Sequence, residues 1–75
     1  MSDIYAAVQS CVASSKAWRR EAGELRDLAR GRHLRESQRQ RLLREAEAAE
    51  RQADYWIAGA REYPLPADLL PSLLE

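Results

Sequence analysis

The chain contains two stretches in which apolar and small residues recur every seven residues, and this repeat constrains the fold more than any other feature. In residues 4–29, one repeating position holds Ile4, Cys11, Trp18 and Leu25, and the other holds Val8, Ser15, Ala22 and Ala29. In residues 42–63, the two positions hold Leu42, Ala49, Trp56 and Tyr63, and Ala46, Ala53 and Ala60. Such a repeat is typical of helices that pack side by side as a coiled coil. Two of them in 75 residues predict an all-α fold, an antiparallel two-helix hairpin.

The same repeat predicts how the two helices pack against each other. The layers in which residue numbers sum to 71 are Val8–Tyr63, Cys11–Ala60, Ser15–Trp56, Trp18–Ala53, Ala22–Ala49, Leu25–Ala46 and Ala29–Leu42. Nearly every layer sets a bulky side chain against a small one, which allows the side chains to interdigitate. We therefore expect Trp18 and Trp56 in the core, with the Ser15 hydroxyl as the hydrogen-bond partner of the Trp56 indole.

Local patterns place the ends of the helices. Gly31 can end the first helix because glycine adopts the left-handed conformation without strain. Ser37 and Gln40 have the spacing of a capping box at the start of the second helix, and Pro64 ends that helix. The hairpin then occupies residues 1–63, with a helix over about residues 3–30, a turn at 31–36 and a helix over about residues 37–63.

Residues 64–75 differ in character from the hairpin. Three prolines prevent a continuation of the second helix, and five leucines argue against a solvated end. We expect this segment to pack as one or two helical turns across the open end of the hairpin or across a partner subunit.

Apolar residues beside the seven-residue repeat indicate self-association. A lone hairpin has nothing with which to cover them, and a patch of this size is typical of an interface. Two hairpins that pair as a four-helix bundle would cover them and enlarge a small core, so we expect a homodimer. The expected interface residues are Tyr5, Val12, Leu28, Leu43, Ile57, Leu69, Leu70, Leu73 and Leu74.

The sequence contains no pattern typical of catalysis. It lacks a glycine-rich phosphate loop, His33 is its one histidine and Cys11 its one cysteine. We therefore expect a protein that is not an enzyme and has no catalytic residues, cofactor, metal or small-molecule substrate. The N-terminal residues do not resemble a secretory signal, and no apolar run is long enough to cross a membrane, so we expect a cytoplasmic protein without membrane contact.

The charges are segregated along the sequence. Residues 16–44 hold ten basic and four acidic residues, a net charge of +6, which leaves −6 for the rest. In a hairpin, the turn end is then basic and the open end acidic. The candidate partner-binding residues are Arg30, Arg32, His33, Arg35 and Arg39. They could contact an acidic protein surface or nucleic-acid phosphates, or simply be solvated.

The segments 16–22 (KAWRREA) and 44–54 (REAEAAERQAD) resemble small Arg/Ala/Glu-rich accessory proteins of phages and prophages. That group includes quorum-sensing anti-activators, which are helical dimers that silence a bacterial transcriptional regulator, and several anti-CRISPR proteins. The resemblance implies a phage-encoded inhibitor that binds and blocks a bacterial host protein. It carries no functional residue over to this chain. Two alternatives remain open: a nucleic-acid-binding accessory factor that uses the basic turn, and a structural subunit of a larger helical assembly.

Overall fold

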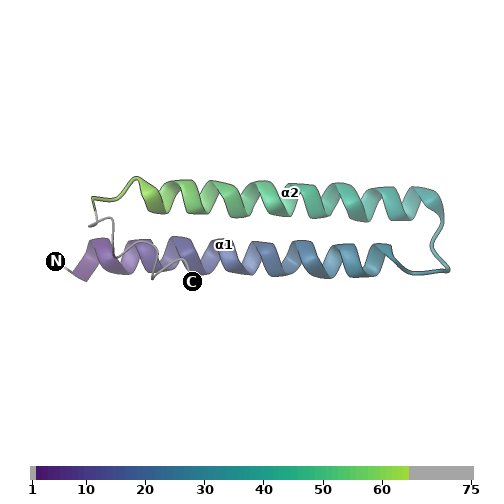
Figure 1. Cartoon of the computed structure of the whole chain (residues 1–75), viewed down its shortest axis with the longest axis horizontal. Coiled ribbons are helices and arrows are strands. Elements are labelled where there is room, and N and C mark those ends of the chain that lie inside the picture. The colour runs from purple at the N-terminus through teal and green to yellow at the C-terminus, as the bar shows by residue number, and fades with distance from the viewer. Residues whose placement is uncertain (1, 65–75) are drawn as a thin grey trace.

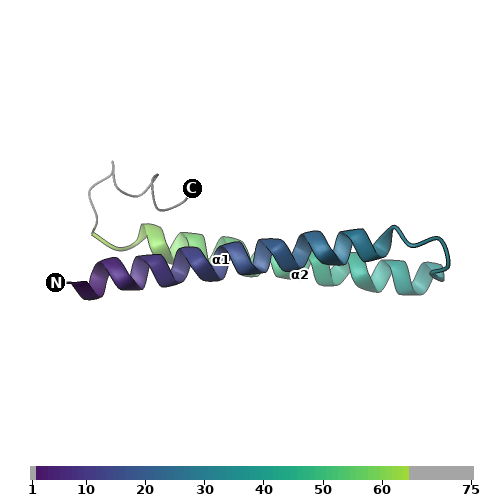
Figure 2. The ribbon, with the colours of Figure 1, turned by 90° about the horizontal axis from the view of Figure 1, so that it is seen from below.

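The computed structural model describes residues 2–64 and contains two helices joined by a short turn. Helix α1 spans Ser2–Ala29 and helix α2 spans Glu36–Arg61. They lie antiparallel along their whole length (Figure 1) and cross at a shallow angle (Figure 2). The result is a narrow rod with extents of 52 × 17 × 16 Å. The predicted all-α, two-helix hairpin is confirmed.

The start of α2 differs slightly from the expected position. The helix begins at Glu36, one residue before the predicted start, and the residue that caps it is Arg35. The Arg35 backbone N–H donates a hydrogen bond to the Gln38 side chain at 2.9 Å. A capping interaction of the predicted spacing therefore exists, but it lies two residues earlier than the expected Ser37–Gln40 pair. The predicted tail lies outside the described residues apart from Pro64.

The turn is held by an arginine of α2, which the sequence analysis assigned to partner binding. Arg39 Nε donates to the Ala29 carbonyl at 2.9 Å, and Arg39 Nη2 donates to the Gly31 carbonyl at 2.8 Å. These bonds satisfy carbonyl groups that the end of α1 leaves without helical partners. Gly31 does not adopt the left-handed conformation that was expected of it. The end of α1 is stabilised by a side chain ten residues downstream.

The seam between the helices consists of the smallest residues of the repeat. Val8, Ser15, Ala22 and Ala29 are buried on α1, and Ala46, Ala53 and Ala60 are buried on α2. The Ser15 hydroxyl donates to the Ala53 carbonyl at 2.8 Å, directly from one helix to the backbone of the other. This bond requires the two helices to approach closely, which small side chains on both sides permit.

The tryptophans of the repeat lie beside this seam, so the predicted layers Ser15–Trp56 and Trp18–Ala53 are wrong. The two residues of other predicted pairs do pack in the same cluster: Cys11 with Ala60, Ala22 with Ala49, and Leu25 with Ala46. Trp18 is 38% exposed and does not pack in the core. Ser15 bonds to Ala53 and not to the Trp56 indole, whose Nε1 is buried without a hydrogen-bond partner among the described residues. The physical reason is distance: helices close enough to join Ser15 to Ala53 leave no room for an indole between them.

Two expected interface residues belong to the core of the hairpin. Val12 and Ile57 are 4% and 8% exposed and form a cluster with Val8 and Ala60. They were expected to remain uncovered until a second copy bound. The close approach of the helices brings them into contact across one side of the seam, so the chain buries them itself.

Candidate functional site

The side chains beside the seam form two different faces of the rod. Successive helical residues are about 100° apart, so residues three and four positions after a seam residue point to opposite sides of it. Cys11, Trp18 and Leu25 follow their seam residues by three positions and lie on one side. Val12 and Arg26 follow by four positions and lie on the other.

The residues of α2 beside its seam also lie on two sides, and each side of α2 adjoins the corresponding side of α1. A hollow lined by Cys11 of α1 is also lined by Trp56 and Tyr63 of α2, so these residues share a side. On the other side, Val12 packs with Ile57. We call the first side the apolar face; its large side chains, with Leu28 adjacent to them, are Ile4, Cys11, Trp18, Leu25, Leu28, Leu42, Trp56 and Tyr63.

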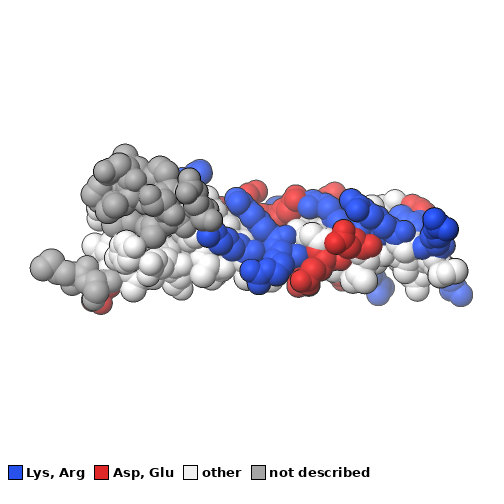
Figure 3. Space-filling view, turned by 60° about the horizontal axis from the view of Figure 1, so that its bottom comes forward, with Lys and Arg blue, Asp and Glu red and all other residues white. Residues whose placement is uncertain are grey.

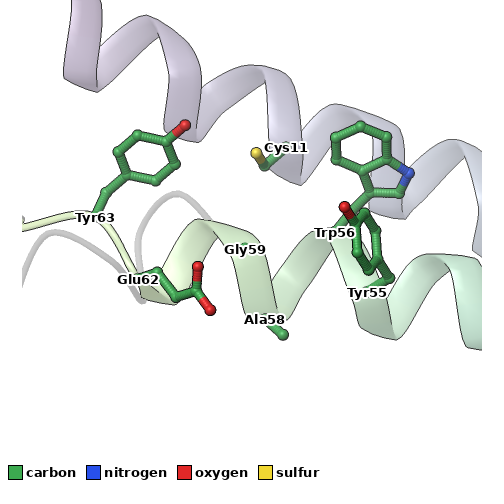
Figure 4. Close-up of a pocket in the computed structure, with 7 residues that line it drawn as sticks. All are labelled: Cys11, Tyr55, Trp56, Ala58, Gly59, Glu62 and Tyr63. Atoms are coloured by element: carbon green, nitrogen blue, oxygen red, sulfur yellow. The ribbon is translucent and has the colours of Figure 1, made fainter.

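The hollow on the apolar face lies near the open end of the hairpin. It has a volume of about 480 Å³, and Figure 4 shows Tyr63 and Trp56 at its two ends with Cys11 between them. The Tyr55 ring packs edge-on against Trp56, with ring centroids 5.5 Å apart. A Cβ atom added to Gly59, which also lines the hollow, would meet no described atom within 4 Å outside the neighbouring part of α2. The hollow is therefore lined by aromatic rings, Cys11 and small residues, with the Glu62 carboxylate at its edge.

The large side chains of the apolar face are incompletely covered by the hairpin. Trp18 and Leu28 are exposed, Leu28 by 61%, as are Ile4 and Tyr63. Cys11, Leu25, Leu42 and Trp56 are half-buried. Contiguous exposed apolar side chains of this kind mark binding surfaces, since they gain free energy when a partner removes them from water.

The expected dimer interface is divided between the two faces. Leu28 belongs to the apolar face, whereas Tyr5 and Leu43 lie on the opposite side, in line with Val12 and Ile57. The leucines of the predicted interface at positions 69, 70, 73 and 74 lie outside the described residues. The sequence alone did not identify which position of the repeat forms the seam. With that information, Trp18 and Cys11 would have been predicted as interface residues in place of Val12 and Ile57.

The opposite side of the rod carries charged residues beyond Val12 and Ile57. Arg26 forms an ion pair with Glu50 across the two helices, with both side chains about half exposed. Figure 3 shows basic and acidic side chains mixed along the middle of the rod. The Arg26–Glu50 pair places this carboxylate of α2 beside an arginine of α1. Glu50 therefore lies in the middle of the rod and not at its open end.

The turn end is strongly basic. Residues 26–44 hold seven arginines against Asp27 and Glu36, a net charge of +5. Of the predicted partner-binding residues, Arg30 pairs with Asp27 at 3.7 Å, and Arg39 holds the turn and pairs with Glu36 at 3.5 Å.

Three predicted partner-binding residues of the turn remain available. Arg32, His33 and Arg35 are exposed and have no ion pair within residues 2–64. They lie within four positions of one another in the short connection between the helices. Two guanidinium groups at this end could contact carboxylate or phosphate groups of a partner.

Comparisons with known proteins identify no relative: no family model, curated protein or solved structure matches the chain. Within the described residues, no three His, Cys, Asp or Glu side chains are grouped as metal ligands would be. Neither described helix is long and apolar enough to cross a membrane. The described features with binding potential are thus two surfaces, the apolar face and the basic turn end.

Proposed function

We propose that this chain is a non-enzymatic interaction protein that acts as a homodimer and blocks a bacterial protein by occupying its surface. The observation that carries the proposal is the apolar face, on which Trp18 and Leu28 remain exposed in the isolated hairpin. A hairpin with so small a core gains stability by covering this face with another protein surface.

The turn end is the proposed contact with the bacterial protein. Arg32, His33 and Arg35 project from the rod without ion-pair partners among residues 2–64. They are suited to an acidic surface because guanidinium groups bind carboxylates in paired hydrogen bonds. The resemblance to phage accessory proteins supports a host target, such as a transcriptional regulator, in the bacterial cytoplasm.

A capture experiment tests this function. The wild-type protein and the double variant Arg32→Glu/Arg35→Glu are immobilised and exposed to bacterial lysate, and the retained proteins are identified by mass spectrometry. A matched control reverses Arg20 and Arg51, which are exposed on the rod away from the turn. We expect wild type and control to retain a protein that the turn variant loses. The purified target should lose activity when mixed with one equivalent of the wild-type hairpin.

Two results would contradict the proposal. If the turn variant retains the same proteins in the same amounts as wild type, the turn is not the contact surface. If no retained protein is inhibited in a stoichiometric mixture, the chain is not an inhibitor. Circular dichroism of all three proteins confirms that the charge reversals leave the helices intact.

The +5 charge of residues 26–44 favours nucleic-acid binding as a second candidate function. Basic residues that neutralise phosphates release counterions, so affinity for a duplex would fall steeply with salt. Fluorescence anisotropy with a labelled duplex at low and at high salt measures this directly. Binding that weakens with salt and is lost in Arg32→Glu/Arg35→Glu would favour the second candidate over the first.

A further inference from the structure

We propose that a second copy of this chain covers the apolar face in antiparallel orientation, and that Trp18 of each copy fills the hollow beside Cys11 and Gly59 of the other. This inference rests on the proposed homodimer. It adds the orientation of the two hairpins and the side chain that holds them together.

The first argument is the match between a protruding side chain and a hollow on the same face. Trp18 and Cys11 are seven residues apart on α1, which is two helical turns or about 10 Å. A two-fold axis that crosses α1 near Ser14, midway between them, places Trp18 of one copy over Cys11 of the other. The same operation fills the second hollow, because a two-fold interface is self-complementary.

The floor of the hollow has room for the incoming indole. Among residues 2–64, no atom outside the neighbouring part of α2 itself lies within 4 Å of the position of a Gly59 Cβ. The Trp56 and Tyr63 rings stand at the two ends, so an inserted Trp18 ring would contact aromatic surface on both sides. Tryptophan in an apolar pocket is a common anchor of protein interfaces.

Acidic residues lie at the edges of the apolar face. Because Ser15 bonds to Ala53, Glu21 lies at nearly the same height along the rod as Glu45. Each directly neighbours the apolar side of its helix. A parallel pair of hairpins would set Glu21 of one copy beside Glu45 of the other on both sides, and such like-charge contacts are costly.

The antiparallel pair removes the contact between Glu21 and Glu45 but moves Glu45 toward Glu62 of the other copy, so the filling of the hollows and not the charge selects the orientation. Rotation about the axis near Ser14 moves Glu21 toward Ala7 and Ser10 of the other copy, and neither of these is charged. It also moves the exposed Leu28 toward the opposite end of the second copy, where Tyr63 stands. A parallel arrangement would instead set hollow against hollow and leave both unfilled.

Cross-linking tests the orientation with the full chain. In Cys11→Ser/Ser14→Cys, the one cysteine lies next to the proposed axis, and two copies meet within the Cα–Cα range of about 4–7 Å that a disulfide needs. The matched control is Cys11→Ser/Gln9→Cys, because Gln9 follows seam residue Val8 by one position and lies on the opposite side of α1 from Ser14.

We expect mild oxidation to convert most of the Ser14→Cys protein, but little of the Gln9→Cys protein, into a covalent dimer on a non-reducing gel. The disulfide-linked protein should keep the helical content and the Trp emission spectrum of the wild-type protein at high concentration. Equal yields from both variants, or no dimer from Ser14→Cys, would overturn the proposed orientation.

A second pair of variants tests the hollow itself. Gly59→Gln places a flexible polar side chain over the floor, whereas Gly23→Gln makes the same change at an exposed position on the other side of α1. Sedimentation equilibrium should show a dimer dissociation constant raised by about tenfold or more for Gly59→Gln and for Trp18→Ala, as expected for loss of an interface anchor, and unchanged for Gly23→Gln. Equal dissociation constants for the two glutamine variants would overturn the assignment of the hollow.

These measurements separate the two proposals. If the wild-type protein sediments as a folded monomer at tens of micromolar but still captures a target through the turn, the homodimer and its orientation are wrong, whereas the proposed contact with a host protein is retained. If the wild-type protein dimerises as described, but the wild type and Arg32→Glu/Arg35→Glu capture the same proteins, the proposed contact with a host protein is wrong and the dimer is retained.

Discussion

Replacing Ala53 by leucine should strongly destabilise the hairpin, although leucine is the residue most often used to strengthen a coiled-coil seam. Ala53 is buried, and its carbonyl accepts the Ser15 hydroxyl at 2.8 Å. A leucine here adds three carbon atoms where the helices are close enough for the Ser15 hydroxyl to reach the backbone of α2. The helices must separate, and the Ser15 hydrogen bond is then lost.

The expected loss can be estimated from these two effects. Inserting extra carbon atoms into a closely packed core costs about 1–3 kcal/mol. The lost Ser15 bond adds about 1 kcal/mol. The free energy of unfolding should therefore fall by about 2–4 kcal/mol, which lowers the melting temperature of a domain of this size by roughly 10–30 °C.

Thermal unfolding followed by circular dichroism at one fixed protein concentration measures this change. The matched control is Ala48→Leu, because Ala48 is exposed on the same helix and should shift the free energy of unfolding by only a few tenths of a kcal/mol. A melting temperature for Ala53→Leu equal to or above that of the wild type would refute the small-residue seam.

Three further changes test other contacts of the hairpin. Ser15→Ala removes the hydroxyl that reaches Ala53 and should lower the free energy of unfolding by about 1 kcal/mol in urea titrations; no change would show that the bond contributes nothing. Arg39→Met keeps the aliphatic stem but leaves the Ala29 carbonyl without its donor, so a loss of about 1–2 kcal/mol is expected, with faster amide hydrogen exchange at the end of α1 than in the wild type. Gly23→Ala fills open space on an exposed helical position and should raise the free energy of unfolding by about 1 kcal/mol; a decrease would mean that Gly23 has a contact the structure does not show.

The sequence predicted the hairpin well because the evidence for it is local and periodic. The repeat that begins at Val8 and the one that ends at Ala60 each specify a helix, and Gly31 marks the break between them. Both predicted helices agree with α1 and α2 to within two residues at each end.

The packing of the helices could not be predicted in the same way. Pairing Trp18 with Ala53 balances side-chain volumes, but it ignores how close the backbones can come. Small residues on both helices favour the closer approach, because it brings more backbone atoms into contact and permits the Ser15 bond. The bulky side chains are then left at the edges, and this places Trp18 on the surface.

The turn shows a second limit of local reasoning. Gly31 suggested a glycine-dependent end to α1, but the stabilising contact comes from Arg39, which is eight residues further along the chain. Nothing in the residues around Gly31 indicates that partner. Equally, nothing near Arg39 distinguishes it from Arg32 and Arg35, which are exposed.

Arg39 has a further consequence, because it occupies the same heptad position as Ala46, Ala53 and Ala60. Because α2 has alanines at intervals of seven residues, sliding α2 along α1 by one heptad would place one alanine where the next one was. The packing of the seam alone therefore distinguishes poorly between these registers. The Ser15 hydroxyl would find an equivalent carbonyl after such a slip. The bonds from Arg39 to Ala29 and Gly31 would have no equivalent after such a slip, so they fix the register of the two helices from the turn end. A hairpin cleaved within its loop should therefore keep one alignment while Arg39 is present, and should populate several alignments when it also carries Arg39→Met.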